Sequence, residues 1–180
     1  MITNDIAQAV TALVSGKLCA IPTETVYGLA ANALDESAVA RVFAAKERPA
    51  DHPLIVHVAS ASDVSEWITE LPQWAIDLTD AVWPGPLTIV GPRTALASNS
   101  VTGNQDTVAV RVPSHPIAQE LLQQLKANGV KGLVAPSANR FGHVSPTSAA
   151  HVSADLGEYL NAHGDLILDG GDCEVGVEST

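Results

Sequence analysis

The chain has 180 residues with 9 Lys or Arg and 20 Asp or Glu, which gives a formal net charge of −11 when the histidines are neutral. A chain of this length can bury about 70% of the surface that it exposes when unfolded, so a stable core needs neither a disulfide nor a structural metal. The negative charge also disfavours wide binding to nucleic acid, because that affinity comes from Lys and Arg neutralising phosphates. We therefore expect one domain over residues 1–180 that binds tRNA directly only weakly or not at all.

Compartment signals are few but consistent with one another. Cys19 and Cys173 stand far apart and form no CxxC pair, which favours a reducing compartment over a secreted scaffold. The first residues lack the basic start and apolar run of a signal peptide, and no stretch approaches the ~20 apolar residues of a membrane span. The sequence predicts a cytoplasmic protein with no membrane partner.

Caps and breakers mark the first elements. Thr3 is expected to cap a helix over 6–14, whose apolar residues follow helical spacing, and Gly16 should end it. The apolar run 18–21 then predicts a short buried strand. Asp35 should cap a second helix, which must end before Pro49 because a residue that precedes proline disfavours the helical conformation.

Strands and helices alternate along the rest of the chain. The remaining strands are expected over 53–58, 87–90, 107–112, 132–135 and 165–168, and the remaining helices over 62–68, 72–83, 115–128 and 146–156. The stretch 91–106 is expected to be a long surface loop. This alternation favours a single layered α/β domain built on one mixed sheet.

Small polar segments follow three of the expected strands, over 22–28, 136–139 and 169–171, and the last leads to 178–180. Ligands of α/β sheets gather at such strand ends, and hydroxyls, amides and free backbone N–H groups suit a phosphate-bearing ligand. Alternatively, Gly, Pro, Ser and Asn are the residues that form turns. For any one segment alone, the turn is the favoured interpretation.

Three basic residues are candidates for anion binding. Lys46 and Arg48 fall at the end of the second helix, where the helix dipole alone favours each cation by about 0.3–1 kcal/mol. The functional interpretation is that Lys46 offers a point charge and Arg48 a planar fork, which together can hold phosphate and carboxylate oxygens. Arg111 lies in an apolar strand, where a guanidinium is costly unless it meets an anion.

Other common signatures are absent. No GxxxxGK[ST], GxGxxG, HExxH or GxSxG pattern occurs, which counts against a Walker-type NTPase, a Rossmann dehydrogenase, a zincin and an α/β-hydrolase. The histidines show no metal-ligand spacing, and only His57, beside Ile55 in a strand, is expected to leave the surface. Trp67, Trp74 and Trp83 lie in expected helices among apolar neighbours and should pack in the core.

Taken together, several segments strongly resemble the YrdC-like family, in order and with matching spacing from about Asp5 to Thr180. They are PTETVYGL at 22–29, KERP at 46–49, PLIVH at 53–57, WPGPLT at 83–88, VAVR at 108–111, PSAN at 136–139 and GVEST at 176–180. The resemblance implies a twisted mixed α/β sheet with helices and a large concave cavity.

The resemblance also implies an activity. L-threonine, bicarbonate and ATP would become threonylcarbamoyl-adenylate and pyrophosphate, which is a nucleotidyl transfer. Mg²⁺ is expected to take part, and no dedicated protein ligands for it are identified. The product would serve modification of adenosine 37 in tRNA, and separate tRNA-modifying transferase proteins would perform that transfer. Such a protein acts on small molecules, which agrees with its negative charge.

Site residues follow from the same resemblance. The family's KxR and SxN signatures fall on Lys46 with Arg48 and on Ser137 with Asn139, and these are the expected catalytic residues. The residues expected to hold threonine or shape its pocket are Thr23, Thr25, Tyr27, His57 and Ser179. The residues expected around the nucleotide are Arg48, Thr107, Arg111, Ser137 and Ser145.

The sequence departs from the family pattern at two places. His52 stands where relatives often carry Asn, which puts a nucleotide contact there in doubt, and relatives continue past Glu-Ser-Thr where this chain stops at Thr180. We therefore expect a truncated or unusually short member. Two alternative functions stay open: a carbamoyl-adenylate-forming carbamoyl transferase module, and a non-catalytic RNA-binding domain, which the lack of a Lys/Arg stripe disfavours.

Overall fold

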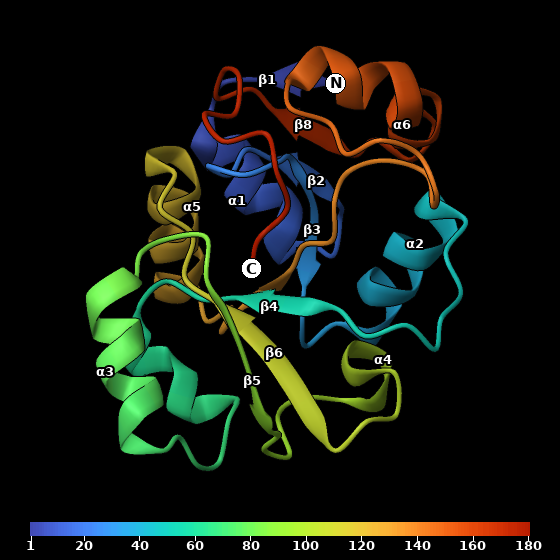
Figure 1. The fold of residues 1–180 in the computed structure, drawn as a ribbon. Coiled ribbons are helices and arrows are strands. Elements are labelled where there is room, and N and C mark those ends of the chain that lie inside the picture. Colours follow the sequence, from blue (N-terminus) through green and yellow to red (C-terminus); the bar gives the residue numbers. More distant parts are fainter.

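The computed structural model describes residues 1–180 and shows one eight-stranded sheet with helices on both faces (Figure 1). The strands are β1 (Ile2–Thr3), β2 (Cys19–Ile21), β3 (Gly28–Asn32), β4 (Ile55–His57), β5 (Thr88–Pro92), β6 (Thr107–Arg111), β7 (Leu133–Val134) and β8 (Leu166–Leu168). The helices are α1 (Ile6–Val14), α2 (Glu36–Lys46), α3 (Gln73–Val82), α4 (Asn99–Thr102), α5 (Pro116–Ala127) and α6 (Ala149–His163), with a 3₁₀ helix η1 (Ala61–Glu66).

The strand order in the sheet is β1-β8-β2-β3-β7-β4-β6-β5. The pairs β1/β8, β2/β8 and β4/β6 are parallel, and the pairs β2/β3, β3/β7, β4/β7 and β5/β6 are antiparallel. The expected mixed α/β sheet in a single domain is thus confirmed. The parallel pairing of β4 and β6 brings His57 beside Arg111.

Two apolar clusters fill the spaces between the sheet and its helices. Helices α1 and α5 cover one face through residues such as Leu13 and Leu121, and α2 and α6 cover the other through residues such as Val42 and Leu156. Because successive strand residues point to opposite faces, β2 supplies side chains to both clusters. The sheet is therefore the middle layer of three.

Capping residues set the boundaries of the helices around the site. Asp5, not Thr3, caps α1 by accepting from the N–H groups of Ala7 and Gln8, because Thr3 is already paired in β1. Asp35 caps α2 as expected, and its carboxylate accepts from Ala38 N at 3.0 Å. Helix α2 ends at Lys46 because Glu47 takes a left-handed conformation with φ of 53°.

Several other sequence expectations need correction. Strands β1 and β3 were not expected, the stretch 91–106 contains the short helix α4, and the helix expected over 62–68 is the 3₁₀ helix η1. The helix expected over 146–156 is α6, which starts at Ala149 after the Ser148 cap and runs to His163. Trp67 is fully buried as expected, but Trp74 is 66% exposed and does not pack in the core. Helix α3 turns only Ala75 and Thr79 toward the interior, and Trp74 lies on its outer side.

The outer edge of β5 is covered at both of its ends. At its start, Thr180 N donates to Pro86 O and Thr88 N donates to Thr180 O, at 3.0 and 2.8 Å. At its far end, Thr69 N donates to Pro92 O at 2.9 Å, and Ile68 forms an isolated bridge with Arg93. Between these contacts, Val90 is the β5 residue left open to solvent, with 64% of its surface exposed.

Candidate active site

A small pocket lies where the turn after β2, the ends of β4 and β6, the loop after β7 and the C-terminal segment meet. Its volume is about 40 Å³, and its lining residues are Thr23, Thr25, Val26, Gly28, Ile55, His57, Arg111, Ala135, Pro136, Ser137, Glu178 and Ser179. Six residues that the sequence predicts for the site therefore share one pocket: Thr23, Thr25, His57, Arg111, Ser137 and Ser179. The pocket is far smaller than the expected concave cavity, and Glu178 and Ser179 of the C-terminal segment form part of its wall.

The turn over 22–28 is held by its own hydroxyl groups. Thr23 Oγ1 accepts from the N–H groups of Thr25 and Val26, both at 3.2 Å, and donates to Val26 O at 2.6 Å. Such local bonds from Thr replace the ladder bonds of a strand and form a tight turn. The Thr23 and Thr25 hydroxyl oxygens end 2.9 Å apart.

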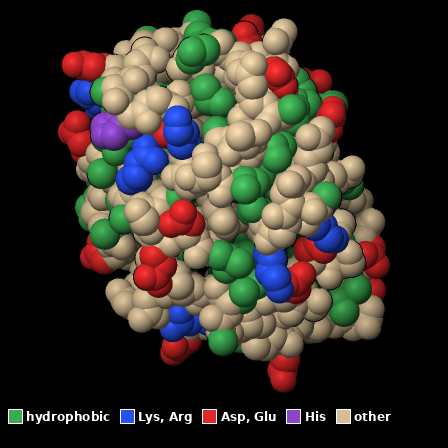
Figure 2. Space-filling view, turned by 180° about the vertical axis from the view of Figure 1, so that it is seen from behind, with side chains coloured by type: hydrophobic (Ala, Val, Ile, Leu, Met, Phe, Trp, Pro, Cys, Tyr) green, Lys and Arg blue, Asp and Glu red, His purple; other side chains and the backbone are tan.

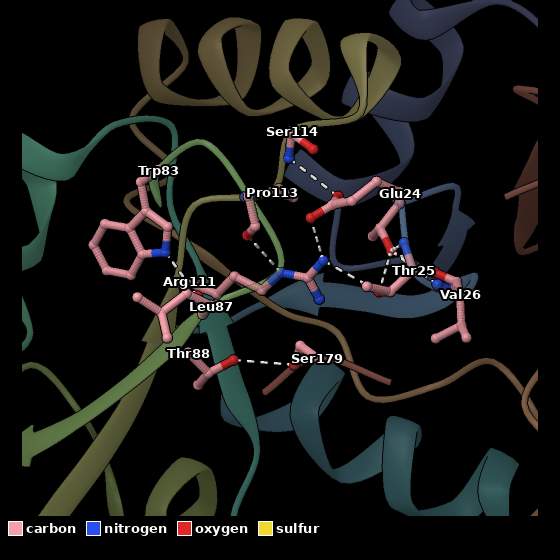
Figure 3. A network of polar contacts seen from close by, with 12 residues as sticks. Glu24, Thr25, Val26, Trp83, Leu87, Thr88, Arg111, Pro113, Ser114 and Ser179 are labelled. Carbon is pink, nitrogen blue, oxygen red and sulfur yellow. Dashed lines mark hydrogen bonds and ion pairs between the residues drawn. The ribbon is translucent and has the colours of Figure 1, made fainter. Parts of the chain in front are cut away.

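Arg111 meets the anion that its apolar strand requires, and the anion is a carboxylate of the chain itself. Arg111 Nη2 contacts Glu24 Oε1 at 2.5 Å and Thr25 Oγ1 at 3.1 Å, and Glu24 Oε2 accepts from Ser114 N at 3.0 Å (Figure 3). Both side chains of the ion pair are buried. Sequence reasoning missed Glu24, whose only signal was its place between two site threonines.

His57 projects from the end of β4 into the same pocket, on the face that it shares with Ile55, as expected. Its Nδ1 lies 3.3 Å from Ile55 O. Burial, and then the charge of Arg111, lowers the pKa of His57 to about 3. The ring is therefore neutral near pH 7 and can hydrogen-bond an uncharged group of a ligand.

Lys46 connects the end of α2 to the loop after β7. Its Nζ donates to the carbonyl of Ser137 and, at 2.6 Å, to the carbonyl of Asn139. Lys46 is 1% exposed, and burial followed by the charge of Arg48 lowers its pKa to about 8. An ammonium has three donors, so these two bonds leave one N–H of Lys46 unused, although Lys46 is not among the residues that line the pocket.

A second hollow of about 240 Å³ adjoins the loop after β7. Its lining residues are Asn139, Val144, Ser145, Pro146, His151 and Asp155. Asn139 is 4% exposed, and its Oδ1 has no hydrogen-bond partner, although Nδ2 donates to Arg140 O and His143 O. Ser145 Oγ donates to Glu178 Oε1 at 2.5 Å, so Glu178, which sequence reasoning missed, joins this hollow to the first pocket.

Two expected nucleotide residues, Arg48 and Thr107, line neither of these hollows. Arg48 donates from Nη2 to Pro53 O at 3.2 Å, and its guanidinium lies 6.0 Å from the ring centroid of Phe141. Thr107 starts β6, at the opposite end of that strand from Arg111. His52 contacts the edge of the Phe141 ring, with 5.5 Å between ring centroids.

Tyr27 does not line the pocket, although the sequence places it there. Its side chain is fully buried, its hydroxyl donates to Gly171 O at 2.8 Å, and the same oxygen accepts from Gly170 N at 3.2 Å. Burial raises the pKa of Tyr27 to about 12. Tyr27 therefore ties the turn after β2 to the loop after β8.

Ser179 is held beside Thr88, with 3.0 Å between their hydroxyl oxygens (Figure 3). The segment that carries it is bound to the turn after β2, since Val175 N donates to Glu24 O at 2.9 Å and Gly176 N to Thr25 O at 3.1 Å. These main-chain bonds place Ser179 in the same pocket as Thr25.

Other features of the surface do not form a competing site. A larger hollow, about 410 Å³, is an open groove between α1 and the start of β8, and none of its lining residues lines the pocket described above. No group of three or more His, Cys, Asp or Glu side chains is placed to hold a metal ion. No helix has both the length and the apolar character required to cross a membrane.

The fold and the pocket define an α/β domain with a polar pocket at the ends of its central strands. Residues 11–180 match the family model Sua5_yciO_yrdC, described as "Telomere recombination". The chain belongs to this Sua5/YciO/YrdC family, as the YrdC-like resemblance predicted.

Named relatives include two threonylcarbamoyl-AMP synthases. The protein from Pyrococcus abyssi is 50% identical over 92% of this chain and 46% of its own length, and that from Bacillus subtilis is 44% identical over 99% of this chain and 50% of its own length. The crystal structure of P. abyssi Sua5 complexed with L-threonine matches with a TM-score of 0.92 and 46% identity, over 100% of this chain and 53% of that chain. The chain thus spans about half the length of these relatives.

Proposed function

We propose that this chain forms threonylcarbamoyl-adenylate from L-threonine, bicarbonate and ATP and releases pyrophosphate, which makes it a nucleotidyltransferase. The observation that carries the proposal is the pocket shared by Thr25, His57, Arg111, Ser137 and Ser179. It is supported by the likeness to a family member described with L-threonine. The product would pass to separate tRNA-modifying proteins in the cytoplasm, where two free thiols would stay reduced.

The pocket suggests how threonine would be held. We assign its carboxylate to Arg111 rather than placing Arg111 at the nucleotide, because Arg111 contacts Thr25 and pairs in register with His57. The neutral His57 ring and the Thr25 hydroxyl would bind the threonine hydroxyl. Ser179 would close the opposite side.

The nucleotide would lie on the side of Lys46. The ammonium of Lys46 and the guanidinium of Arg48 would hold phosphates beside Ser137, and the unpaired Asn139 Oδ1 with Ser145 would accept the rest of the nucleotide in the adjoining hollow. Thr107 would contact the nucleotide only if the ligand extends along β6.

Chemistry in such a site requires positioning more than covalent help. The threonine amine would combine with bicarbonate to give a carbamate, and an oxygen of that carbamate would attack the α-phosphorus of ATP while pyrophosphate leaves. Fixed positive groups would hold the reacting oxygens in line, and a closed pocket would keep water from the labile carbamate and adenylate. Glu178 is the only carboxylate that lines the pocket, so the residues present do not form a Mg²⁺ site, and Mg²⁺ would arrive as part of the ATP substrate.

Substrates need more room than the present pocket offers. About 40 Å³ is close to the volume of one water molecule, whereas small-molecule sites occupy about 300–1,000 Å³. The segment 173–180 would therefore move outward on binding, which requires its bonds to Glu24 and Thr25 to open.

The two alternatives differ in their substrates. The surface opposite the view of Figure 1 carries Lys and Arg side chains singly or in pairs among acidic ones, with no continuous basic stripe, which disfavours RNA binding on that face (Figure 2). A carbamoyl transferase module would use carbamoyl-phosphate in place of threonine and bicarbonate.

The test is pyrophosphate release from ATP in the absence of tRNA, with threonine and bicarbonate omitted in turn. We expect release only when both are present. Undiminished release without threonine would contradict the proposal, and release that requires carbamoyl-phosphate would support the transferase alternative. A salt-dependent titration with tRNA, expected to show no binding at physiological salt, tests the RNA-binding alternative.

A further inference from the structure

Glu24 is a buried carboxylate whose two oxygens are both engaged. The residue is 6% exposed, Oε1 accepts from Arg111 and Oε2 accepts from Ser114 N, which lies just before α5. Its own carbonyl accepts from Val175 N in the segment that covers the pocket. Glu24 thus joins three separate parts of the chain at one point.

The donors of Arg111 are divided between protein and pocket. Nη2 is used by Glu24 and Thr25, and Nε points to Gly85 O at 3.4 Å. Nη1 makes no hydrogen bond within the protein and is not among the buried atoms that lack a partner. Since Arg111 lines the pocket, Nη1 is the edge of the guanidinium that a ligand can reach.

Stability alone does not explain this ion pair. Burying two charges costs desolvation energy that their attraction barely offsets, and well-packed apolar residues of similar size are often as stable. The ion pair instead fixes the orientation of the Arg111 guanidinium. Ser114 N holds the Glu24 carboxylate in place, and Arg111 must adopt the geometry that bonds to it.

We propose that Glu24 is a positioning residue that holds the Arg111 guanidinium with Nη1 directed at the substrate carboxylate. The inference rests on the proposed function, in which that carboxylate belongs to threonine. Glu24 acts through Arg111 and does not touch the substrate. The same carboxylate also neutralises the charge of Arg111 in the unliganded protein, so that Arg111 need not recruit a solvent anion.

The test compares threonine affinity in two Glu24 variants by calorimetry. Glu24→Gln removes the charge and sets its amide NH2 against one of the two donors, Arg111 Nη2 or Ser114 N, while Glu24→Asp keeps the charge but is too short to reach both partners. Each is expected to raise the threonine Kd by roughly 10- to 100-fold and to leave the ATP Kd within about twofold of wild type. Asp63→Asn is the matched control, because Asp63 is also buried, pairs with Lys126 at 2.5 Å and lies outside the pocket.

The outcomes separate the possible roles. A purely structural role for Glu24 would lower the melting temperature in the same way as Asp63→Asn and leave the threonine Kd unchanged, which would overturn the inference. A purely electrostatic role would spare Glu24→Asp and tighten threonine binding in Glu24→Gln, which would also overturn it. Failure of the wild-type protein to bind threonine would instead overturn the proposed function.

Discussion

His57 lies directly beside Arg111 in the parallel strands β4 and β6, and burial together with the Arg111 charge lowers the pKa of His57 to about 3. The ordinary pKa of histidine is about 6.5. The unfolded chain therefore binds a proton between these two pH values that the folded chain does not bind. This relationship makes protein stability sensitive to acid through one residue.

We expect the His57 contribution to stability to be fully present above pH 6.5 and to be lost as the pH falls toward 3. Between pH 6.5 and pH 5, the free energy of unfolding should fall by about 2 kcal/mol more in wild type than in His57→Gln. Urea unfolding of both proteins at the two pH values measures this difference. Equal pH dependence in the two proteins would show that His57 is not held neutral.

Lys46 should give the reaction an alkaline limit. Its pKa is lowered to about 8, so its charge is lost as the pH rises through that value. We expect kcat/KM for pyrophosphate release to fall about tenfold per pH unit above pH 8. Lys46→Arg should be slower but should keep its charge and lack this limit. The measurement is kcat/KM from pH 6 to pH 10 for both proteins. The same alkaline loss of activity in Lys46→Arg would show that another group causes it.

Arg48→Lys tests whether the guanidinium fork is used for binding. The change keeps a positive charge at the end of α2 but loses the planar donor geometry and the contact with Phe141, so activity should fall by about 10- to 100-fold. The melting temperature should barely change. Arg93→Lys, at an arginine that binds Ala97 O away from the pocket, is the control. Full activity of Arg48→Lys would leave only the helix-dipole explanation for Arg48.

Substrate discrimination follows from the buried polar groups of the pocket. Valine would leave the Thr25 and His57 groups unpaired and should be rejected by as much as roughly 10⁴-fold relative to threonine. Serine lacks only a methyl group and should be disfavoured by roughly 10- to 200-fold. Competition assays with both amino acids measure these ratios, and valine competing as well as serine would disprove the hydroxyl contacts.

Tyr27→Phe separates a structural tyrosine from a ligand contact. The change removes the hydroxyl that bonds Gly171 O and Gly170 N, and it should destabilise the protein by about 1–2 kcal/mol. Threonine affinity should stay within about twofold of wild type because Tyr27 does not line the pocket. A large loss of threonine affinity at unchanged stability would show that the Tyr27 hydroxyl does contact the ligand.

The sequence predicted most elements because their signals are local. Asp35 before an amphipathic stretch and Gly16 after another mark helix ends through bonds between near neighbours. Strand β3 was missed because Gly28–Asn32 contains no β-branched or aromatic residue, and what makes it a strand is pairing on both sides with β2 and β7. Such a segment becomes a strand because it is buried in the middle of a sheet, and a local sequence pattern does not reveal that burial.

The candidate site was predicted in outline for a different reason. Its motifs resemble those of a family, and six of the predicted residues do share one pocket. Glu24 was missed because its role comes from a contact with Arg111 that spans 87 positions of sequence. The same resemblance placed Thr107 around the nucleotide together with Arg111, yet the two residues lie at opposite ends of the five-residue strand β6.

The covered edge of β5 bears on how molecules of this protein meet one another in solution. An exposed sheet edge with several free N–H and C=O groups invites a strand from another chain, and that contact leads to aggregation. Here Thr180 occupies one end of the edge and Thr69 the other, so an incoming strand would find its hydrogen-bonding groups only near Val90. One residue is too short a template for a ladder, and the chain is thereby protected against growth of its sheet from that side.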